Sequence, residues 1–120
     1  MTAEGQIVLF EFPRTDQVAG KLRPALVLRA LPGPYDDWLV CMISTRLYHA
    51  VPGIDEIIPE TDPDFAATGL RSTSLIRLTR LAVVCVDILE GALGQIAESR
   101  LDRLRTRLGE WITADTQGTA

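Results

Sequence analysis

The chain has 120 residues, of which 47% are hydrophobic and 23% charged, close to the composition of an ordinary globular domain. We therefore predict a single domain over residues 1–120, with its folded core at about 5–112. Twelve Lys and Arg against sixteen Asp and Glu residues give a net charge of −4, which excludes a protein that coats nucleic acid through bulk charge.

The sequence also predicts a cytoplasmic protein without a membrane span. Its longest apolar run, residues 81–86, is far too short to cross a bilayer, and its N-terminus lacks a basic segment followed by an apolar one. Cys41 and Cys85 each lie in an apolar run, where a reduced cysteine acts as a small hydrophobic side chain. We therefore expect no disulfide between them.

Short apolar runs predict a small sheet. Residues 7–12 and 26–28 are rich in β-branched and aromatic side chains and are bounded by Pro13 and Pro24, so both are predicted strands joined by a polar loop. Further strands are expected at 38–43, buried on both faces, and at 54–58. A last strand is expected at 74–86, where Arg77 alternates with apolar neighbours.

Helical patterns occur at two places. Residues 65–70 predict a single turn closed by Gly69, after an acidic turn cluster at 59–64. Residues 97–112 predict a helix, because Leu101, Leu104, Leu108 and Trp111 recur at helical spacing, although Ala97 makes a poor cap. Arg100, Arg103 and Arg107 are interpreted as its solvated flank.

About five short strands followed by one helix, without alternation of strands and helices, predict an α+β domain with a small curved antiparallel sheet. Periodicity alone leaves barrel and sandwich open. No cysteine and histidine spacing typical of a metal site is present, and His49, beside Tyr48, is interpreted as part of an exposed loop.

Three blocks in order resemble the PemK/MazF family of bacterial toxins, over about residues 5–111. The first joins Gly5-x-Ile-Val, a Phe-Pro-x-Thr-Asp loop and Lys-x-Arg-Pro-Ala-Leu-Val-Leu; the second is Val-Cys-Met-Ile-Ser-Thr-Arg at 40–46. The third runs from Asp-Phe-Ala-Ala-Thr-Gly-Leu at 64–70 to Ser-Leu-Ile-Arg at 74–77. The resemblance implies the SH3-like antiparallel barrel of CcdB, PemK and MazF with a C-terminal helix, and a homodimeric toxin restrained by a cognate antitoxin protein.

The resemblance further implies a growth-inhibiting endoribonuclease that needs neither metal nor cofactor. In this family the 2′-hydroxyl of single-stranded RNA attacks the adjacent phosphate, at a short specific sequence, and leaves a cyclic phosphate and a free 5′-hydroxyl. Such chemistry requires charge stabilisation at phosphorus and proton transfer at oxygen. Single-stranded substrate suits it, because unstacked bases can be read directly.

Four catalytic residues follow from the resemblance. Arg23 matches the arginine that contacts the phosphate; a guanidinium with a pKa above about 12 is better suited to holding an oxyanion than to giving up a proton. Ser44 and Thr45 match the family's hydroxyl position, with Ser44 favoured. Arg77 matches a later catalytic arginine, but the family's aspartate two positions on, the proposed general base, is Thr79 here, which cannot act as a base at neutral pH.

The remaining polar residues near these positions are predicted to contact RNA, namely Arg14, Asp16, Gln17, Lys21, Arg46 and Thr79. An acidic protein can bind RNA if its cations converge in one groove while its carboxylates lie elsewhere, and we expect this of Arg14, Lys21, Arg23, Arg46 and Arg77. Two other functions stay open: a non-catalytic module that binds antitoxin or RNA on the same fold, which Thr79 favours, and a topoisomerase poison like CcdB.

Overall fold

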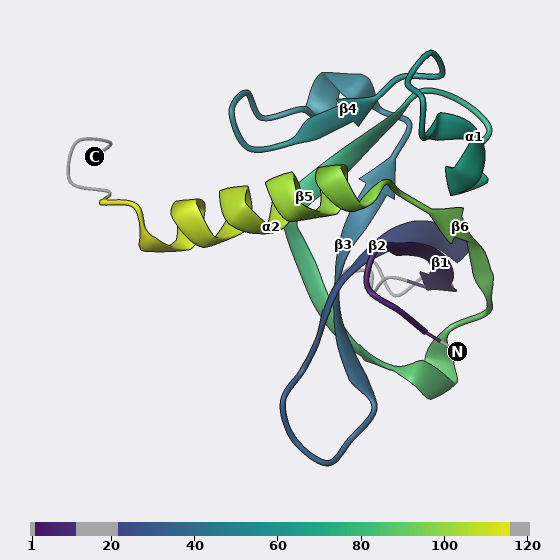
Figure 1. The fold of residues 1–120 in the computed structure, drawn as a ribbon, viewed down its shortest axis with the longest axis vertical. Helices are drawn as coiled ribbons and strands as arrows, with labels where there is room; N and C mark the ends of the chain where they lie inside the picture. The colour runs from purple at the N-terminus through teal and green to yellow at the C-terminus, as the bar shows by residue number, and fades with distance from the viewer. Residues whose placement is uncertain (1, 12–21, 116–120) are drawn as a thin grey trace, which may run out of the picture.

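The polypeptide forms one curled antiparallel sheet with a helix lying across it (Figure 1). The structure is a computed structural model that describes residues 2–11 and 22–115. Its strands follow the order β4-β5-β3-β2-β1-β6 across the sheet, and every neighbouring pair is antiparallel. They are β1 (Gln6–Glu11), β2 (Leu22–Ala30), β3 (Asp37–Ser44), β4 (Glu56–Ile58), β5 (Ser74–Cys85) and β6 (Ala92–Gln95).

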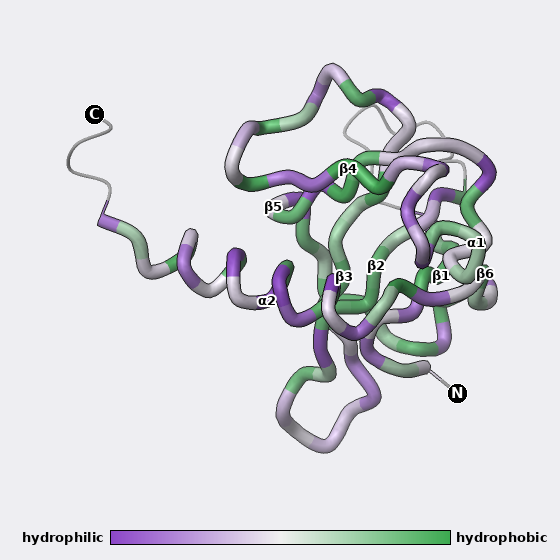
Figure 2. The backbone as a smooth tube through the Cα atoms, turned by 45° about the horizontal axis from the view of Figure 1, so that its top comes forward, coloured by the Kyte–Doolittle hydropathy of each residue, from purple (hydrophilic) through white to green (hydrophobic). Residues whose placement is uncertain are grey.

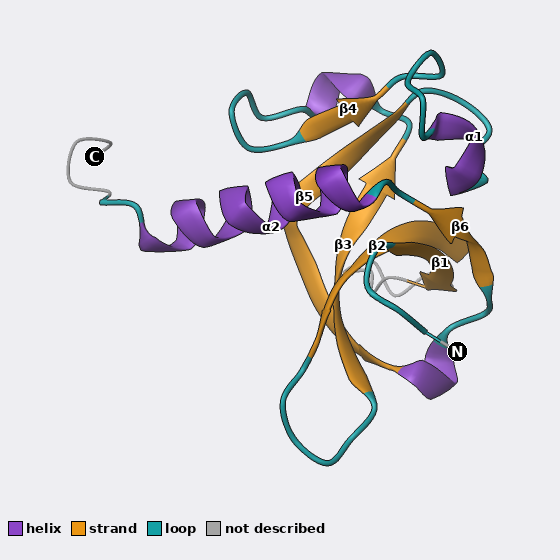
Figure 3. Cartoon of the chain, viewed as in Figure 1, coloured by secondary structure: helices purple, strands orange, loops and turns teal. Residues whose placement is uncertain are grey.

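The helical elements are few. A single turn, α1 (Phe65–Thr68), precedes β5, and the C-terminal helix α2 (Glu98–Thr113) follows β6. Two short 3₁₀ turns, η1 (Leu47–His49) and η2 (Val86–Ile88), complete the set. Figure 3 shows the sheet curling into a half-barrel with α2 across its open side. The structure thus confirms the predicted α+β fold with a small curved antiparallel sheet and a C-terminal helix.

Both faces of the sheet are packed. On the face covered by α2, Ile7, Leu26, Ile43 and Ile76 join the helix residue Leu104 in one buried cluster. The opposite face carries a second, smaller cluster built on Val8, Phe10, Ala25, Val27, Val40 and Val84. Figure 2 shows these hydrophobic residues running along β1, β2 and β3, whereas hydrophilic residues recur along α2. Burial on two faces explains why the strands are continuous apolar runs.

Helix α2 packs through one stripe. Leu101, Leu104 and Leu108 are buried, as their spacing predicted, but Trp111 is 45% exposed. The reason is visible in Figure 1, where the end of α2 extends past the edge of the sheet. The helix lacks a side-chain cap from Ala97 itself; the carboxylate of Asp64 accepts the Ala97 N–H at 3.0 Å instead. A residue 33 positions earlier therefore caps the helix.

Two predictions were wrong, one about a strand and one about the burial of a cysteine. The strand β6 was not predicted; it contains Gly94, which pairs with Ile7 of β1. Cys85 is exposed at the end of β5, opposite the first residue of β3, whereas Cys41 is fully buried as expected; both thiols are free. The turn at 65–70 was predicted correctly, because α1 ends at Gly69, whose φ of 73° is left-handed.

Candidate active site

A pocket of about 430 Å³ opens where β2 begins and β3 ends. These two ends are neighbours because the strands are antiparallel, and Ala25 on β2 is in register with Met42 on β3. Arg23 and Ser44 each lie two residues beyond that pair, so they belong to the same end and the same face of the sheet. Arg23, Ser44 and Thr45 all line the pocket.

The rest of the lining comes from segments distant in sequence. Residues 69–72 and 74, which follow α1, form one side, and Leu93 of β6 forms another. The members are Leu9, Leu22, Pro24, Ile43, Gly69, Leu70, Arg71, Ser72, Ser74 and Leu93, so the walls are apolar and the polar groups are guanidinium and hydroxyl. Of the described residues that line this pocket, none is acidic and none is a histidine.

Close backbone contact between α1 and β6 fixes this pocket wall. A Cβ placed on Gly69 would lie 2.3 Å from the carbonyl oxygen of Leu93, and one placed on Gly94 would lie 2.1 Å from that of Ala67. No side chain fits at either position, so both glycines are required by space, and Gly69 also by its left-handed φ. The sequence signal for this contact is Gly94, around which the sequence predicted no element.

The two candidate hydroxyls differ in their surroundings. Ser44 is half-buried, and its Oγ accepts the backbone N–H of Arg46 at 3.0 Å. Thr45 is exposed at the same rim. A hydroxyl that already accepts a hydrogen bond still has its own proton to donate, so Ser44 can donate to a phosphate oxygen from a fixed position.

Arg77 lines a second pocket, of about 330 Å³, with Val51, Asp55, Thr79, Arg80 and Trp111. It is in register with Met42, two residues before Ser44, so β3 lies between the strand of Arg77 and the strand of Arg23. Its Nε is buried and has no hydrogen-bond partner among the described residues. Arg77 therefore flanks the first pocket from the next strand without lining it.

The carboxylate of the second pocket already has partners. Asp55 accepts the N–H of Val51 at 2.9 Å through one oxygen and the N–H of Leu78 at 3.0 Å through the other. These two bonds tie the segment before β4 to β5. Asp55 thus serves as a structural acceptor in the same pocket as Thr79.

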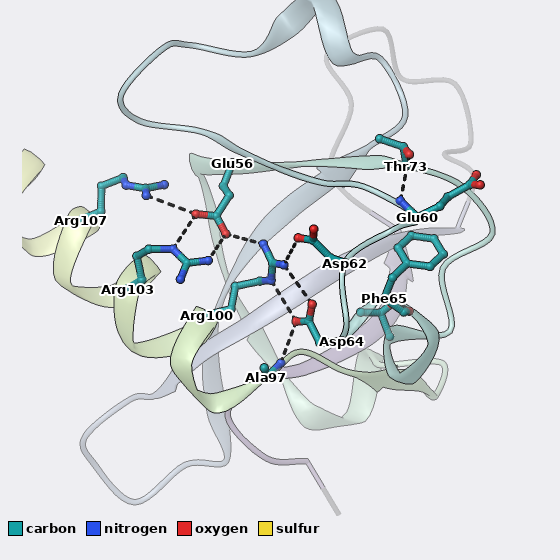
Figure 4. A network of polar contacts seen from close by, with 11 residues as sticks. Glu56, Glu60, Asp62, Asp64, Phe65, Thr73, Ala97, Arg100, Arg103 and Arg107 are labelled. Atoms are coloured by element: carbon teal, nitrogen blue, oxygen red, sulfur yellow. Dashed lines mark hydrogen bonds and ion pairs between the residues drawn. The ribbon is translucent and has the colours of Figure 1, made fainter.

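Three arginines of α2, namely Arg100, Arg103 and Arg107, form an ion network with the acidic segment 56–64, drawn in Figure 4. Arg100 donates to Glu56 and Asp62 at 2.6 Å each and to Asp64 at 2.9 Å. Glu56 also accepts from Arg103 and Arg107. The prediction of a solvated flank was wrong for Arg100, which is only 6% exposed. Glu56, Asp62 and Asp64 of this segment therefore bind the helix, and none of the three lines either pocket.

These contacts hold the carboxylates ionised. Burial alone raises the pKa of Glu56, but hydrogen bonds from Arg103 and Arg100 outweigh it and lower that pKa. For Asp64 the hydrogen bond from Arg100 is the largest effect and lowers its pKa. The same bond raises the pKa of Arg100. The network is therefore fully charged at neutral pH.

The profile of the PemK-like, MazF-like toxins of type II toxin–antitoxin systems matches residues 3–112. This match spans nearly the whole chain. The chain belongs to this family. Endoribonuclease activity is general among its members.

Solved structures share the fold of this toxin at low sequence identity. An endoribonuclease in complex with its cognate antitoxin, from a mycobacterial species, is 12% identical and covers 96% of this chain and 98% of its own, with a TM-score of 0.67. The Mycobacterium tuberculosis toxin MazF-mt6 is 19% identical, with coverages of 92% and 98% and a TM-score of 0.65. A MazE–MazF structure from Deinococcus radiodurans is also 19% identical, with coverages of 95% and 98% and a TM-score of 0.66. A search of curated proteins found no match.

In this toxin the predicted site residues that the structure describes fall into three groups. Arg23, Ser44 and Thr45 share the first pocket, and Arg77 and Thr79 share the second. Arg46 is exposed next to Thr45 but lines neither pocket. The predicted RNA contacts Arg14, Asp16, Gln17 and Lys21 lie outside the described residues.

Sequence reasoning missed Arg71 and Ser72, which line the first pocket beside Arg23. Tyr48 is 76% exposed, and its ring meets that of His49 edge-on, 4.4 Å between centroids, in the turn η1. The prediction of an exposed His49 was wrong, because His49 is half-buried and its Nδ1 is buried without a hydrogen-bond partner among the described residues. Within the described part of the toxin, no group of three or more His, Cys, Asp or Glu side chains is arranged to hold a metal ion. Nor does any described helix have the length and apolar character needed to cross a membrane.

Proposed function

We propose that this toxin is a metal-independent endoribonuclease that cuts single-stranded RNA by attack of a ribose 2′-hydroxyl on the adjacent phosphate. The observation that carries the proposal is the pocket in which Arg23 meets Ser44 and Thr45 from the neighbouring strand end. A guanidinium and a hydroxyl are suitable donors for the phosphate oxygens, whose negative charge grows as the fifth bond to phosphorus forms. As the bond from the 2′-oxygen to phosphorus forms, the 2′-hydroxyl gives its proton to water. As the bond from phosphorus to the 5′-oxygen breaks, the 5′-oxygen takes a proton from water, and the products are a 2′,3′-cyclic phosphate and a free 5′-hydroxyl.

Arg23 is assigned to the scissile phosphate. It forms no ion pair with any described carboxylate, so its charge is available to an anion. Ser44 is assigned as the hydroxyl donor because its Oγ is held by the N–H of Arg46. Arg77 is assigned a contact with the same RNA molecule from β5, which is separated from the strand of Arg23 by β3.

Acid–base help is weak in this arrangement. The described lining of the first pocket has no carboxylate or imidazole, and Thr79 supplies no base in the second. Catalysis is then mainly charge stabilisation and alignment of the 2′-hydroxyl with the phosphate, which are also the two contributions that need no titrating side chain.

Incubation of the purified toxin with mixed-sequence RNA in excess chelator tests the proposal. We expect cleavage that persists without metal and falls by roughly 10²–10³-fold in Arg23→Ala, as for the loss of one oxyanion donor. Arg29→Ala is the matched control, since Arg29 lies on the same strand, is exposed and lines neither pocket. New 5′-ends that accept a phosphate from polynucleotide kinase without prior phosphatase treatment identify the expected products.

The same assay separates the second candidate function. Intact RNA at high concentrations of wild-type protein favours a non-catalytic module that binds antitoxin or RNA, as the substitution at Thr79 suggests. Growth arrest with intact RNA and broken DNA favours a topoisomerase poison. Either result contradicts the nuclease proposal.

We further propose a cytoplasmic homodimer that is held inactive by a cognate antitoxin protein. Support comes from the family match and from two structures with this fold that contain such partners, the mycobacterial complex and MazE–MazF. Light scattering on a sizing column should give about twice the 13.2 kDa chain mass. A monomer at micromolar concentration contradicts the dimer.

A further inference from the structure

The first pocket contains a second guanidinium with no assigned role. Arg71 lines the pocket together with Arg23, and it forms no ion pair or side-chain hydrogen bond with a described residue. The contrast with α2 is clear, because Arg100, Arg103, Arg105 and Arg107 each contact a carboxylate. Arg71 therefore brings an uncompensated positive charge to the pocket that holds Arg23.

The backbone that carries Arg71 is held on both sides. Upstream, Thr68 is fully buried, and its Oγ1 donates to the carbonyl of Phe65 and accepts the N–H of Leu70. Downstream, Thr73 accepts the N–H of Glu60, and Ser74 donates to the carbonyl of Ser72. Arg71 thus projects from a short segment with fixed ends, which reduces the entropy lost when its guanidinium binds a ligand.

The space between the two arginines has the chemistry of a nucleotide site. Its walls are apolar side chains, among them Leu22, Pro24 and Leu93, and its polar groups are hydroxyls and guanidinia. A volume of about 430 Å³ is within the range of roughly 300–1,000 Å³ of small-molecule sites. A nucleobase offers an apolar face for such walls and a hydrogen-bonding edge for hydroxyls.

We propose that Arg71 binds a phosphate neighbouring the one at Arg23, and that the apolar wall takes the base of the adjoining nucleotide. This inference rests on the proposed function of the same pocket. It assigns the pocket to two consecutive phosphates and one base, rather than to the scissile phosphate alone. A cation provides positioning and affinity here, whereas the wall supplies the contact to the base.

The test is binding of a fluorescein-labelled, mixed-sequence oligodeoxynucleotide, which lacks the 2′-hydroxyl and so cannot be cut. Anisotropy is measured from about 50 to 200 mM salt, where each lost phosphate contact flattens the slope of log K against log salt by about 0.7 for a single strand. We expect this change in Arg71→Gln, with affinity lowered about three- to tenfold at the lowest salt. Arg29→Gln, which removes the same charge outside the pocket, should keep the wild-type slope.

A second variant tests the base. Leu22 is 51% exposed, so Leu22→Ser should leave the fold intact. We expect this variant to bind the oligonucleotide several-fold more weakly, with an unchanged slope of log K against log salt. Its binding of an abasic oligonucleotide should equal that of the wild type. Arg71→Gln should weaken the binding of both oligonucleotides.

The phosphate assignment is overturned if Arg71→Gln and the wild type have equal slopes of log K against log salt. It is also overturned if Arg29→Gln loses as much affinity as Arg71→Gln. Equal effects of Leu22→Ser on the normal and abasic strands overturn the base assignment. RNA cleavage by the wild type is measured in parallel and reports separately on the proposed function. Cleavage without Arg71-dependent binding overturns only the inference, and Arg71-dependent binding without cleavage overturns only the nuclease.

Discussion

Replacing Arg100 with methionine tests whether the ion network holds α2 on the sheet. The substitution removes the charge but keeps an unbranched apolar side chain. It strips Asp64 and Asp62 of their guanidinium partner, while Glu56 keeps Arg103 and Arg107. The side chains of Arg100, Glu56 and Asp64 are only 8%, 13% and 12% exposed, so the pairs are largely removed from water.

The expected loss is large for one surface-accessible helix. Removing one partner of a buried ion pair costs roughly 3–5 kcal/mol, because the other charge is left unpaired. Asp62 is 33% exposed and Glu56 keeps two arginines, which places the expected loss at the lower end, about 3 kcal/mol. For a chain of this size that corresponds to a melting temperature lower by roughly 10–15 °C.

Urea unfolding followed by tryptophan fluorescence and by circular dichroism measures this loss. We expect the dependence of the unfolding free energy on urea concentration, the m-value, to stay unchanged. Arg103→Met is the matched control, since Arg103 binds the same Glu56 but is 49% exposed; we expect it to cost roughly 0.2–1 kcal/mol. The reasoning is refuted if the two variants lose the same stability. A change of slope in Arg100→Met, with signals that no longer coincide, points instead to α2 detaching separately from the sheet.

Three further predictions concern packing, thiols and acid. Gly94→Ala should cost about 2–3 kcal/mol because its Cβ meets the Ala67 carbonyl, whereas Gly109→Ala, in α2 with open space, should gain about 0.5–1 kcal/mol; equal unfolding midpoints refute this. In native protein a maleimide should label Cys85 quickly and Cys41 only upon unfolding, since burial protects Cys41 and raises its pKa; fast double labelling is the contrary result. Because the network lowers the pKa of its carboxylates from ordinary values of 4.5 and 3.8, stability should be full above about pH 5 and fall as acid protonates them, with a shallower fall in the Arg100→Met variant; parallel acid profiles contradict it.

Periodicity was sufficient for the elements whose packing is local. The alternation along 74–86 and the leucine spacing in 97–112 predicted β5 and α2, because each element buries its own face. It failed at β6. This strand contains Gly94, a position where the Ala67 carbonyl leaves no space for a side chain. It also failed at Arg100. Periodicity does not distinguish Arg100 from Arg103 and Arg107 on the same helix, because the carboxylates that bury Arg100 lie 36 to 44 residues away in the sequence.

The candidate site was predictable only in part for the same reason. Antiparallel pairing of successive strands brings Arg23 and Ser44 to one end of the sheet, so strand order alone suggests their proximity. Arg71 joins them through the contact of α1 with β6, which involves backbone atoms and leaves no pattern of side chains. Arg77 was expected with Arg23, but it pairs with Met42 on the side of β3 away from β2, and it lines another pocket.

The arrangement of charge explains how an acidic protein can present a site for an anion. Glu4, Glu56, Asp62, Asp64 and Asp102 are all paired with arginines of α2, so these acidic groups offer little repulsion to a ligand elsewhere. The first pocket has two guanidinia and, in its described lining, no carboxylate. With a net charge of −4, the protein as a whole does not attract RNA, so we expect affinity to come from local cations such as Arg23 and Arg71. Binding should therefore depend on salt through a few phosphates only, with a much shallower slope than a basic groove of many contacts gives.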